Sequence, residues 1–153
     1  MRAGDDVAHP PCRAWGALRH FARPRPDERD LAIFAVDVVR RCGGVLEHPA
    51  YSTLWRVAGL PFPGERDAFG GWTLPLPQFW FGHRARKNTG LYIVGTDIRN
   101  LPAFPMVLGD APCVVASRLR GGGRRPEISK AEREATPPGL ARWLVDLARG
   151  CRP

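Results

Sequence analysis

Hydrophobic and polar residues follow two kinds of spacing along this chain, one typical of strands and the other typical of helices. Short apolar runs bounded by turn-forming residues predict strands in DDVAHPPC (5–12), GGVLEHP (43–49), GGWTLPLPQFWFGH (70–83), GLYIVG (90–95) and CVVAS (113–117). The third run contains several prolines, so we expect an irregular strand there. The run GLYIVG has the clearest pattern of a buried strand.

Apolar residues at helical spacing predict a first helix that begins after Asp27, because Asp is a favourable N-cap residue and acidic residues follow it. We expect Leu31, Phe34, Val38 and neighbouring apolar residues to form one face of this helix. Gly43 and Gly44 would end it, since glycine readily adopts the backbone conformation found beyond the last turn of a helix.

Two further helices are predicted, a short one in STLWRVAGL (52–60) and a longer one over 137–149. The last helix would have Thr136 as its N-cap and Pro137 at its first position, where a missing backbone N–H does no harm. Its apolar face would consist of Leu140, Trp143, Leu144 and Leu147.

Strands that alternate with helices predict an α/β domain with a mostly parallel sheet and flanking helices. The length of 153 residues is enough for one domain, 1–153, and for a sizeable core. A basic loop over 118–130 would precede the C-terminal helix, 137–149.

The formal net charge of +8 and the pI of about 10.3 favour a polyanionic partner such as DNA. Nearly all of the positive charge is arginine, with Lys87 and Lys130 as the lysines, and this bias is also typical of a GC-rich genome. No apolar run is long enough to cross a membrane, and Asp5 and Asp6 argue against a signal peptide. We therefore expect a cytoplasmic protein without a membrane partner, with its widely spaced cysteines reduced.

The segment His9-Pro10-Pro11-Cys12 ends the first predicted strand and is stiffened by its two prolines. A stiff loop suits a nucleophilic thiol that must be held in place, although an inert buried cysteine is the simpler alternative. Glu47 ends the second predicted strand. If the two strands are parallel neighbours, Cys12 and Glu47 share one edge of the sheet, where ligands of α/β proteins bind.

Four segments, in order, resemble the later motifs of cytosine-5 DNA methyltransferases, especially the small phage and bacterial versions. They are AHPPC (8–12), VLEHP (45–49), FGHRARKNTGLYIVG (81–95) and EREATPPGLARWL (132–144). The resemblance implies a partial Rossmann-like methyltransferase sheet and DNA as the partner. It implies that Cys12 attacks C6 of an extruded cytosine while Glu47 holds the N3 and N4 edge of the ring.

The resemblance also implies roles for residues around this pair. The substrate-binding residues would be His48, His83, Arg84, Arg86, Lys87 and Thr89. Pro10 and Thr136 would lie against the methyl donor, S-adenosylmethionine. The glycine-rich strand and turn that bind this cofactor in the family should precede DDVAHPPC, and the sequence has no counterpart there.

Three explanations for that difference remain open. The chain is a shortened reading frame of a longer enzyme, or a homodimer partner or second chain covers the exposed edge of its first strand, or the domain has lost methyl transfer. A non-catalytic DNA-binding or interaction protein on the same fold is therefore the alternative function.

Several other patterns have a structural and a functional interpretation. The aromatic residues Trp72, Phe79, Trp80 and Phe81 are expected mainly in the core, and base stacking is the alternative. A zinc site formed by His9, Cys12, His48 and His83 is a weaker possibility, because only the first two have ligand-like spacing. The arginines Arg118, Arg120, Arg124 and Arg125 would suit a flexible phosphate clamp, and a disordered loop is the equal alternative.

Overall fold

The computed structural model describes residues 6–16, 19–116 and 125–152. Its centre is a four-stranded sheet with the strand order β1-β2-β4-β3. The strands are β1 (Val7–Ala8), β2 (Gly44–Pro49), β3 (Trp72–Pro77) and β4 (Asn88–Val94). β1 pairs in parallel with β2, whereas β4 pairs antiparallel with both β2 and β3.

The sheet is therefore mixed, and the expectation of a mostly parallel, Rossmann-like sheet is wrong in that respect. The parallel pair β1 and β2 is joined through α1 (Glu28–Cys42), the kind of long crossover that parallel strands require. The connection from β3 to β4 contains only the 3₁₀ turn η2 (Gln78–Phe81), so these two strands pair antiparallel. The α/β class itself is confirmed.

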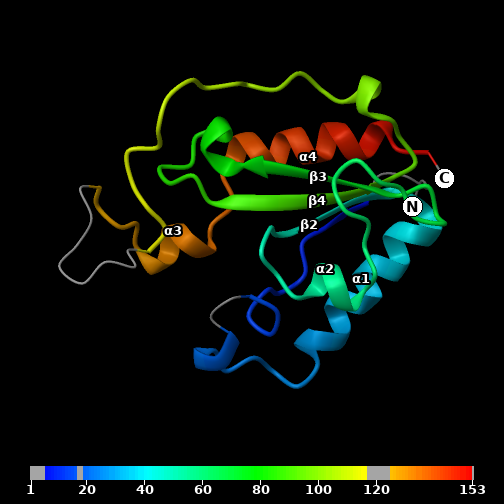
Figure 1. Ribbon diagram of the computed structural model, residues 1–153, viewed down its shortest axis with the longest axis horizontal. Helices are drawn as coiled ribbons and strands as arrows, with labels where there is room; N and C mark the ends of the chain where they lie inside the picture. The colour runs from blue at the N-terminus through cyan, green and yellow to red at the C-terminus, as the bar shows by residue number, and fades with distance from the viewer. Residues whose placement is uncertain (1–5, 17–18, 117–124, 153) are drawn as a thin grey trace.

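Helices cover both faces of the sheet (Figure 1). α4 (Pro138–Gly150) lies along one face, and its apolar residues pack with Val45, Leu91 and Ile93 of the sheet. α1 and the short α2 (Leu54–Val57) lie on the opposite face. The remaining elements are α3 (Lys130–Glu134), η1 (Arg19–Phe21) and η3 (Ile98–Asn100).

The bounds of α1 agree with the prediction, but its buried face does not. The helix follows Asp27 and ends before Gly43, although the Asp27 side chain makes no capping hydrogen bond. The buried apolar residues are Ala32, Val36 and Val39, whereas Leu31 and Phe34 are 40% and 61% exposed. Apolar residues of α1 itself occur on all sides of the helix. The smaller ones face the sheet, because they allow the helix to pack closely against it.

The C-terminal helix has the predicted apolar face, because Leu140, Trp143, Leu144 and Leu147 are all buried. Its N-cap position is occupied by Pro137, however, so Thr136 does not cap it as predicted. The Thr136 hydroxyl is buried and has no hydrogen-bond partner among the described residues.

The prediction of a strand over 113–117 is wrong for the described residues 113–116. This segment makes only isolated bridges, between Ala85 and Cys113 and between Val114 and Glu127. The long proline-rich connection before it runs alongside α4 (Figure 1), and the Trp143 indole N–H lies 3.2 Å from the Pro102 carbonyl oxygen. The arginines Arg118, Arg120 and Arg124 of the predicted basic loop lie outside the described residues.

β1 is the terminal strand of the sheet, as expected for the first strand of this pattern. It is shorter and less buried than predicted, because it contains two residues and Val7 is exposed. Within the described ranges, no helix is long and apolar enough to span a bilayer.

Candidate functional site

Cys12 and Glu47 lie near each other at one end of the parallel strand pair. Val7 pairs with Val45 and Ala8 with Leu46, so the chain that leaves β1 passes beside the end of β2. The Cys12 thiol is half-buried, so burial raises its pKa, and the Glu47 carboxylate lies close enough to raise it further. The neighbouring strands predicted from sequence therefore bring the two residues together.

An ion pair beside Cys12 fastens its loop to the start of α1. The Arg13 guanidinium binds both oxygens of the Glu28 carboxylate, and its Nε lies 3.3 Å from Oε2. Glu28 is completely buried, whereas Arg13 is half-exposed. A buried carboxylate that pairs with arginine in this two-pronged geometry fixes both groups, so Arg13 holds the Cys12 loop in position.

Trp15 provides a second anchor for the same loop. Its ring is fully buried between the sheet and α1, and its backbone N–H closes a turn on the Cys12 carbonyl oxygen at 3.0 Å. The Trp15 carbonyl oxygen accepts hydrogen bonds from the Thr53 backbone N–H at 3.0 Å and the Thr53 hydroxyl at 3.1 Å. The loop is thus tied to α1 through Arg13 and to the start of α2 through Trp15.

Glu47 is almost completely buried, with only 3% of its surface exposed. The Thr89 hydroxyl donates a hydrogen bond to Oε1 of Glu47, and Nε2 of Gln78 donates to the same oxygen at 3.3 Å. Oε2 of Glu47 forms an ion pair with Nε2 of His9 at 2.9 Å. The His9 side chain is 47% exposed, so it stands between the carboxylate and solvent.

These contacts shift the pKa values of Glu47 and His9 in opposite directions. Burial acts to raise the pKa of Glu47, but the hydrogen bonds and positive charges from His9, Thr89 and Lys87 outweigh it, and the pKa is lowered. The hydrogen bond with Glu47 raises the pKa of His9. The contact therefore favours the ionised carboxylate together with the protonated imidazole.

The charge of Lys87 acts on both Cys12 and Glu47. Burial lowers the pKa of Lys87, while the Glu47 carboxylate and the Cys12 thiolate oppose that effect. The Lys87 ammonium donates a hydrogen bond to the Ala135 carbonyl oxygen at 2.7 Å, at the end of α3. Lys87 has a positive φ of 33°, an uncommon conformation for a residue other than glycine, and such strain often accompanies functional sites.

Burial raises the pKa of the Cys12 thiol, and the Glu47 carboxylate raises it further. The positive charge of Lys87 opposes this shift by favouring the thiolate. Cys12 is therefore a thiol at neutral pH that needs a base before it can attack, and Lys87 is the cation placed to stabilise the anion once it forms.

His48 follows Glu47 in β2 but projects from the opposite face of the sheet, because side chains alternate along a strand. It is completely buried, and burial lowers its pKa to about 4. At neutral pH His48 is thus an uncharged ring beneath the loop that carries Cys12, whose Pro11 backbone lies near it.

Two more residues predicted to bind substrate, His83 and Arg84, lie in the segment before β4. The His83 ring is buried and within 2.8 Å and 3.1 Å of the carbonyl oxygens of Ala85 and Glu132. Arg84 pairs with the Glu132 carboxylate at 2.9 Å and is exposed. These contacts tie the segment before β4 to α3, so His83 and Arg84 have structural partners.

Sequence reasoning missed Arg13, Glu28 and Gln78. Arg13 follows Cys12 directly, so its position beside the candidate nucleophile was a usable signal. Glu28 and Gln78 gave no signal of their own, since an acidic residue in the first turn of a helix and a glutamine after a strand are ordinary features. Their roles depend on tertiary contacts.

The described residues contain no group of three or more His, Cys, Asp or Glu side chains placed to hold a metal ion. The four cysteines, Cys12, Cys42, Cys113 and Cys151, are free thiols. Comparisons with protein-family models, with curated proteins and with solved structures found no match.

The described residues do not fit S-adenosylmethionine. The usual site for a nucleotide-like cofactor on an α/β sheet is a glycine-rich turn between a strand and the N-terminus of a helix. β1 is followed by the proline loop, and β2 is followed by residues 50–53, which contain no glycine. Pro10 is buried and Thr136 has a buried hydroxyl without a partner, which does not make a cofactor pocket.

Proposed function

We propose that this protein is a cytosine-5 DNA methyltransferase-like protein that binds an extruded cytosine and adds the Cys12 thiolate to it. The observation that carries the proposal is the position of Cys12 near a buried, hydrogen-bonded Glu47 at the ends of two parallel strands. The high net positive charge supports a nucleic acid as the partner.

Glu47 has the properties needed to read the polar edge of cytosine. Thr89 and Gln78 both donate to Oε1, which fixes the orientation of the carboxylate. Oε2 then remains for the ligand once His9 moves away, and a carboxylate oxygen accepts well from an exocyclic amine or a protonated ring nitrogen. His9 is half-exposed, so its side chain can turn toward solvent.

The chemical step balances without any cofactor. The Cys12 thiol first loses its proton to water. Its sulfur then forms a bond to C6, the C5–C6 double bond becomes single, and its electron pair shifts through the ring to N3, which takes a proton from water. Glu47 stabilises this N3-protonated form, and Lys87 stabilises the thiolate before attack. C5 can then take a proton from water, and loss of its original proton with departure of the thiolate restores cytosine.

Methyl transfer would require a donor site beyond the residues described here. The alternative, a non-catalytic DNA-binding protein on this fold, differs in one measurable respect. It would bind DNA without adding a thiol to the base, so the exchange of hydrogen at C5 separates the two functions.

The test is exchange of the C5 hydrogen of cytosine in heavy water, read by mass spectrometry of the nucleosides. We would incubate the protein with a pool of single-stranded and duplex DNA of mixed sequence. Single strands are included because their bases need no unpairing. The wild type should introduce deuterium at C5, and Cys12→Ala should not.

Cys42→Ala is the matched control, because Cys42 is also half-buried but lies at the end of α1. It should exchange hydrogen at the wild-type rate. If the wild type binds DNA without any exchange, the proposed nucleophile is wrong and the non-catalytic protein is the better account.

A further inference from the structure

The outer side of α1 carries an apolar stripe that remains accessible to solvent. Leu31, Phe34 and Val38 follow one another at intervals of three and four residues, so they lie on one side of the helix. Leu31 is 40% exposed and Phe34 is 61% exposed, whereas Val38 is partly buried. α1 lies at the rim of the molecule, and its other side packs on the sheet (Figure 1). An apolar stripe of this kind is typical of a surface that another chain covers.

Charged residues of opposite sign stand at the two ends of this α1 stripe. Asp27 has helical backbone angles and lies one turn before the stripe, and Arg41 lies one turn after it. The Asp27 carboxylate is 3.9 Å from Nε of Arg25, but both side chains are largely exposed, so this ion pair is weak. Arg41 donates to the Asp37 carbonyl oxygen at 3.2 Å, and no carboxylate of the described residues pairs with it.

The order of acid, apolar stripe and base makes this surface complementary to itself. Asp27 lies seven residues before Phe34, and Arg41 lies seven residues after it. When two copies of α1 pack antiparallel about a two-fold axis at Phe34, Asp27 of each copy meets Arg41 of the other. A parallel pair would place like charges together at both ends instead. The charges therefore favour the antiparallel arrangement.

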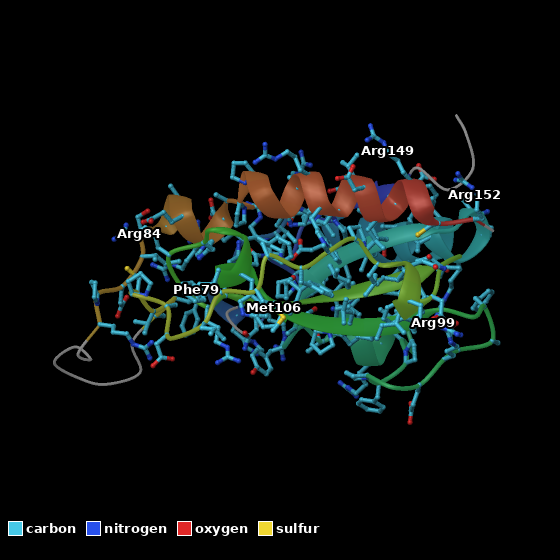
Figure 2. The ribbon with its side chains drawn as sticks, turned by 90° about the horizontal axis from the view of Figure 1, so that it is seen from above. Phe79, Arg84, Arg99, Met106, Arg149 and Arg152 are labelled. Atoms are coloured by element: carbon cyan, nitrogen blue, oxygen red, sulfur yellow. The ribbon has the colours of Figure 1, made fainter. Side chains whose placement is uncertain are left out.

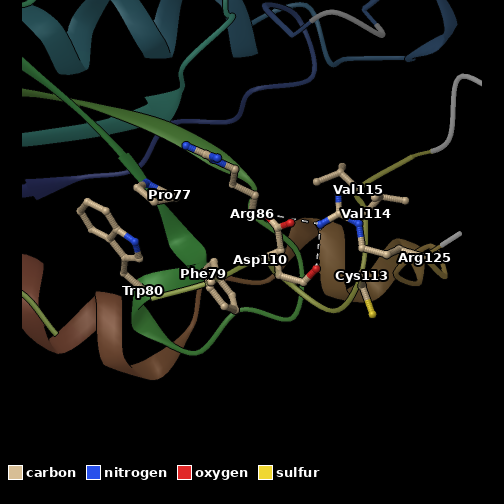
Figure 3. Close-up of a pocket in the computed structure, with 11 residues that line it drawn as sticks. Pro77, Phe79, Trp80, Arg86, Asp110, Cys113, Val114, Val115 and Arg125 are labelled. Atoms are coloured by element: carbon tan, nitrogen blue, oxygen red, sulfur yellow. Dashed lines mark hydrogen bonds and ion pairs between the residues drawn. The ribbon is translucent and has the colours of Figure 1, made fainter. Parts of the chain in front are cut away.

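The overall charge of the chain limits where two copies can meet. The formal net charge is +8, so two copies repel each other over much of their surfaces. Arg86, one of the residues predicted to bind substrate, is exposed and lines a cavity of about 330 Å³ beside η2 together with Arg125 (Figure 3). Residues 27–42, by contrast, contain four acidic and three basic side chains. Repulsion between two copies is therefore small along α1.

We propose that the α1 stripe binds a second copy of this chain, giving a weak antiparallel homodimer with Asp27–Arg41 contacts at both ends. This surface differs from the edge of β1, where sequence alone would place a partner. Three apolar side chains from each copy form a small interface, and the acidic flanks of Asp30 and Asp37 would adjoin in the pair. We therefore expect a Kd of about 10–100 µM.

The dimer would also contact the support of the candidate site. Asp27 directly precedes Glu28, the buried carboxylate that Arg13 binds. The second copy would therefore touch the end of α1 that holds the Cys12 loop. The dimer itself does not depend on the proposed function.

The first test is sedimentation velocity from about 1 µM to about 500 µM, a range that spans the expected Kd. Phe34→Glu should raise the Kd about 50-fold or more, because it places a charge at the centre of the interface in both copies. Val145→Glu is the matched control, because Val145 is 41% exposed on α4, on the opposite face of the sheet. It should change the Kd less than about twofold.

The second test reverses the charges at the ends of the stripe, at low salt. Asp27→Arg and Arg41→Asp should each raise the Kd about fivefold or more, because like charges then meet at both ends. An equimolar mixture of the two variants should return to within about threefold of the wild-type affinity, because opposite charges meet again. Arg149→Asp is the matched control, since Arg149 also lies in the last turn of a helix and projects from the outer side of α4 (Figure 2).

Three results would overturn the proposal. A wild-type chain that stays monomeric at about 500 µM has no such interface. A dimer that Phe34→Glu leaves intact uses another surface, such as the edge of β1. Charge variants that weaken the dimer and do not recover when mixed would refute the antiparallel order. Phe34 is exposed, so Phe34→Glu should melt at the wild-type temperature in dilute solution, which separates loss of the dimer from loss of the fold.

Discussion

Two buried carboxylates lie on either side of the Cys12 loop, and they differ in the cations that hold them. Glu28 at the start of α1 is fully buried and is bound by Arg13, a group that remains charged at any physiological pH. Glu47 at the end of β2 is nearly as buried, but its partner is His9, a half-exposed group with a pKa raised by the contact.

The comparison separates a structural contact from one that can open. The Arg13–Glu28 pair has two-pronged geometry, and breaking it would leave a charge in the core. The His9–Glu47 pair is a single contact that ends when the imidazole loses its proton. Glu47 would keep its hydrogen bonds from Thr89 and Gln78 in that event. We therefore interpret Glu28 as the anchor and Glu47 as the binding group.

The largest expected difference between the two carboxylates is in activity. Glu47→Gln should lower the rate of C5 exchange about 100-fold or more, because an uncharged amide stabilises the N3-protonated ring poorly. Glu28→Gln should lower the exchange rate less than about tenfold, measured where the variant is folded.

The thermal melting of both variants provides the control. Glu28→Gln should melt at a lower temperature than Glu47→Gln, because the Arg13 anchor is weakened. Equal losses of exchange in the two variants would show that Glu47 acts only through the fold.

The next largest effect concerns stability in acid. In the unfolded chain, the His48 imidazole takes up a proton near pH 6.5. Burial lowers the pKa of His48 to about 4, so the folded chain takes up this proton only near pH 4. The unfolded state binds more protons in that window, and stability therefore falls as the pH falls. The loss should reach about 3 kcal/mol at pH 4.

Urea denaturation at several pH values would measure this effect. His48→Leu should remove the loss between pH 6.5 and pH 4, because leucine fills a similar volume and does not titrate. His20→Leu, at an exposed histidine, should keep the wild-type pH profile. A His48→Leu variant with an unchanged acid profile would contradict the assignment.

The meeting of Cys12 and Glu47 could be predicted from sequence, because two short apolar runs with a helix between them form a parallel pair. The buried face of α4 could also be predicted, since its apolar residues occupy one side. The buried face of α1 could not, because apolar residues surround that helix and only tertiary packing selects Ala32 over Phe34.

The contacts around the two carboxylates were largely beyond sequence reasoning. Gln78 reaches Glu47 because β3 ends beside β4, and the mixed order of the sheet was not predicted. Thr89 could be selected only by its place in a motif. Glu28 is buried because the Cys12 loop folds back over α1, and that path depends on Trp15 filling the core.

A smaller effect, on stability, is expected from removing Arg13, the half-exposed partner in the Arg13–Glu28 ion pair. Arg13→Ala should lower the free energy of unfolding by about 2 kcal/mol, because it leaves the buried Glu28 carboxylate without its main partner. Arg25 lies 3.9 Å from Glu28 and would offset part of that loss. Arg23→Ala, an exposed arginine in the same connection, should change stability by less than about 0.5 kcal/mol. Equal effects of the two variants in urea denaturation would refute the anchor.

The smallest expected effect is the pH dependence that His9 gives to the site. The raised pKa of His9 means that its pairing with Glu47 is fully present below about pH 6.5. The pairing is lost as the pH rises through the folded value, and Glu47 is then free to accept a base. The lowered pKa of Glu47 keeps the carboxylate ionised across this range, so its contribution is lost only as the pH falls through that value.

His9→Gln should therefore raise the rate of C5 exchange a few-fold at pH 6 and leave it unchanged at pH 9. The rate of both proteins should still increase with pH, because the Cys12 thiol must also lose its proton. The ratio of the two rates at each pH isolates the contribution of His9. Loss of exchange in His9→Gln at every pH would instead make His9 a participant in the proton transfers. In that case the contrast between a permanent anchor at Glu28 and a releasable contact at Glu47 would no longer hold.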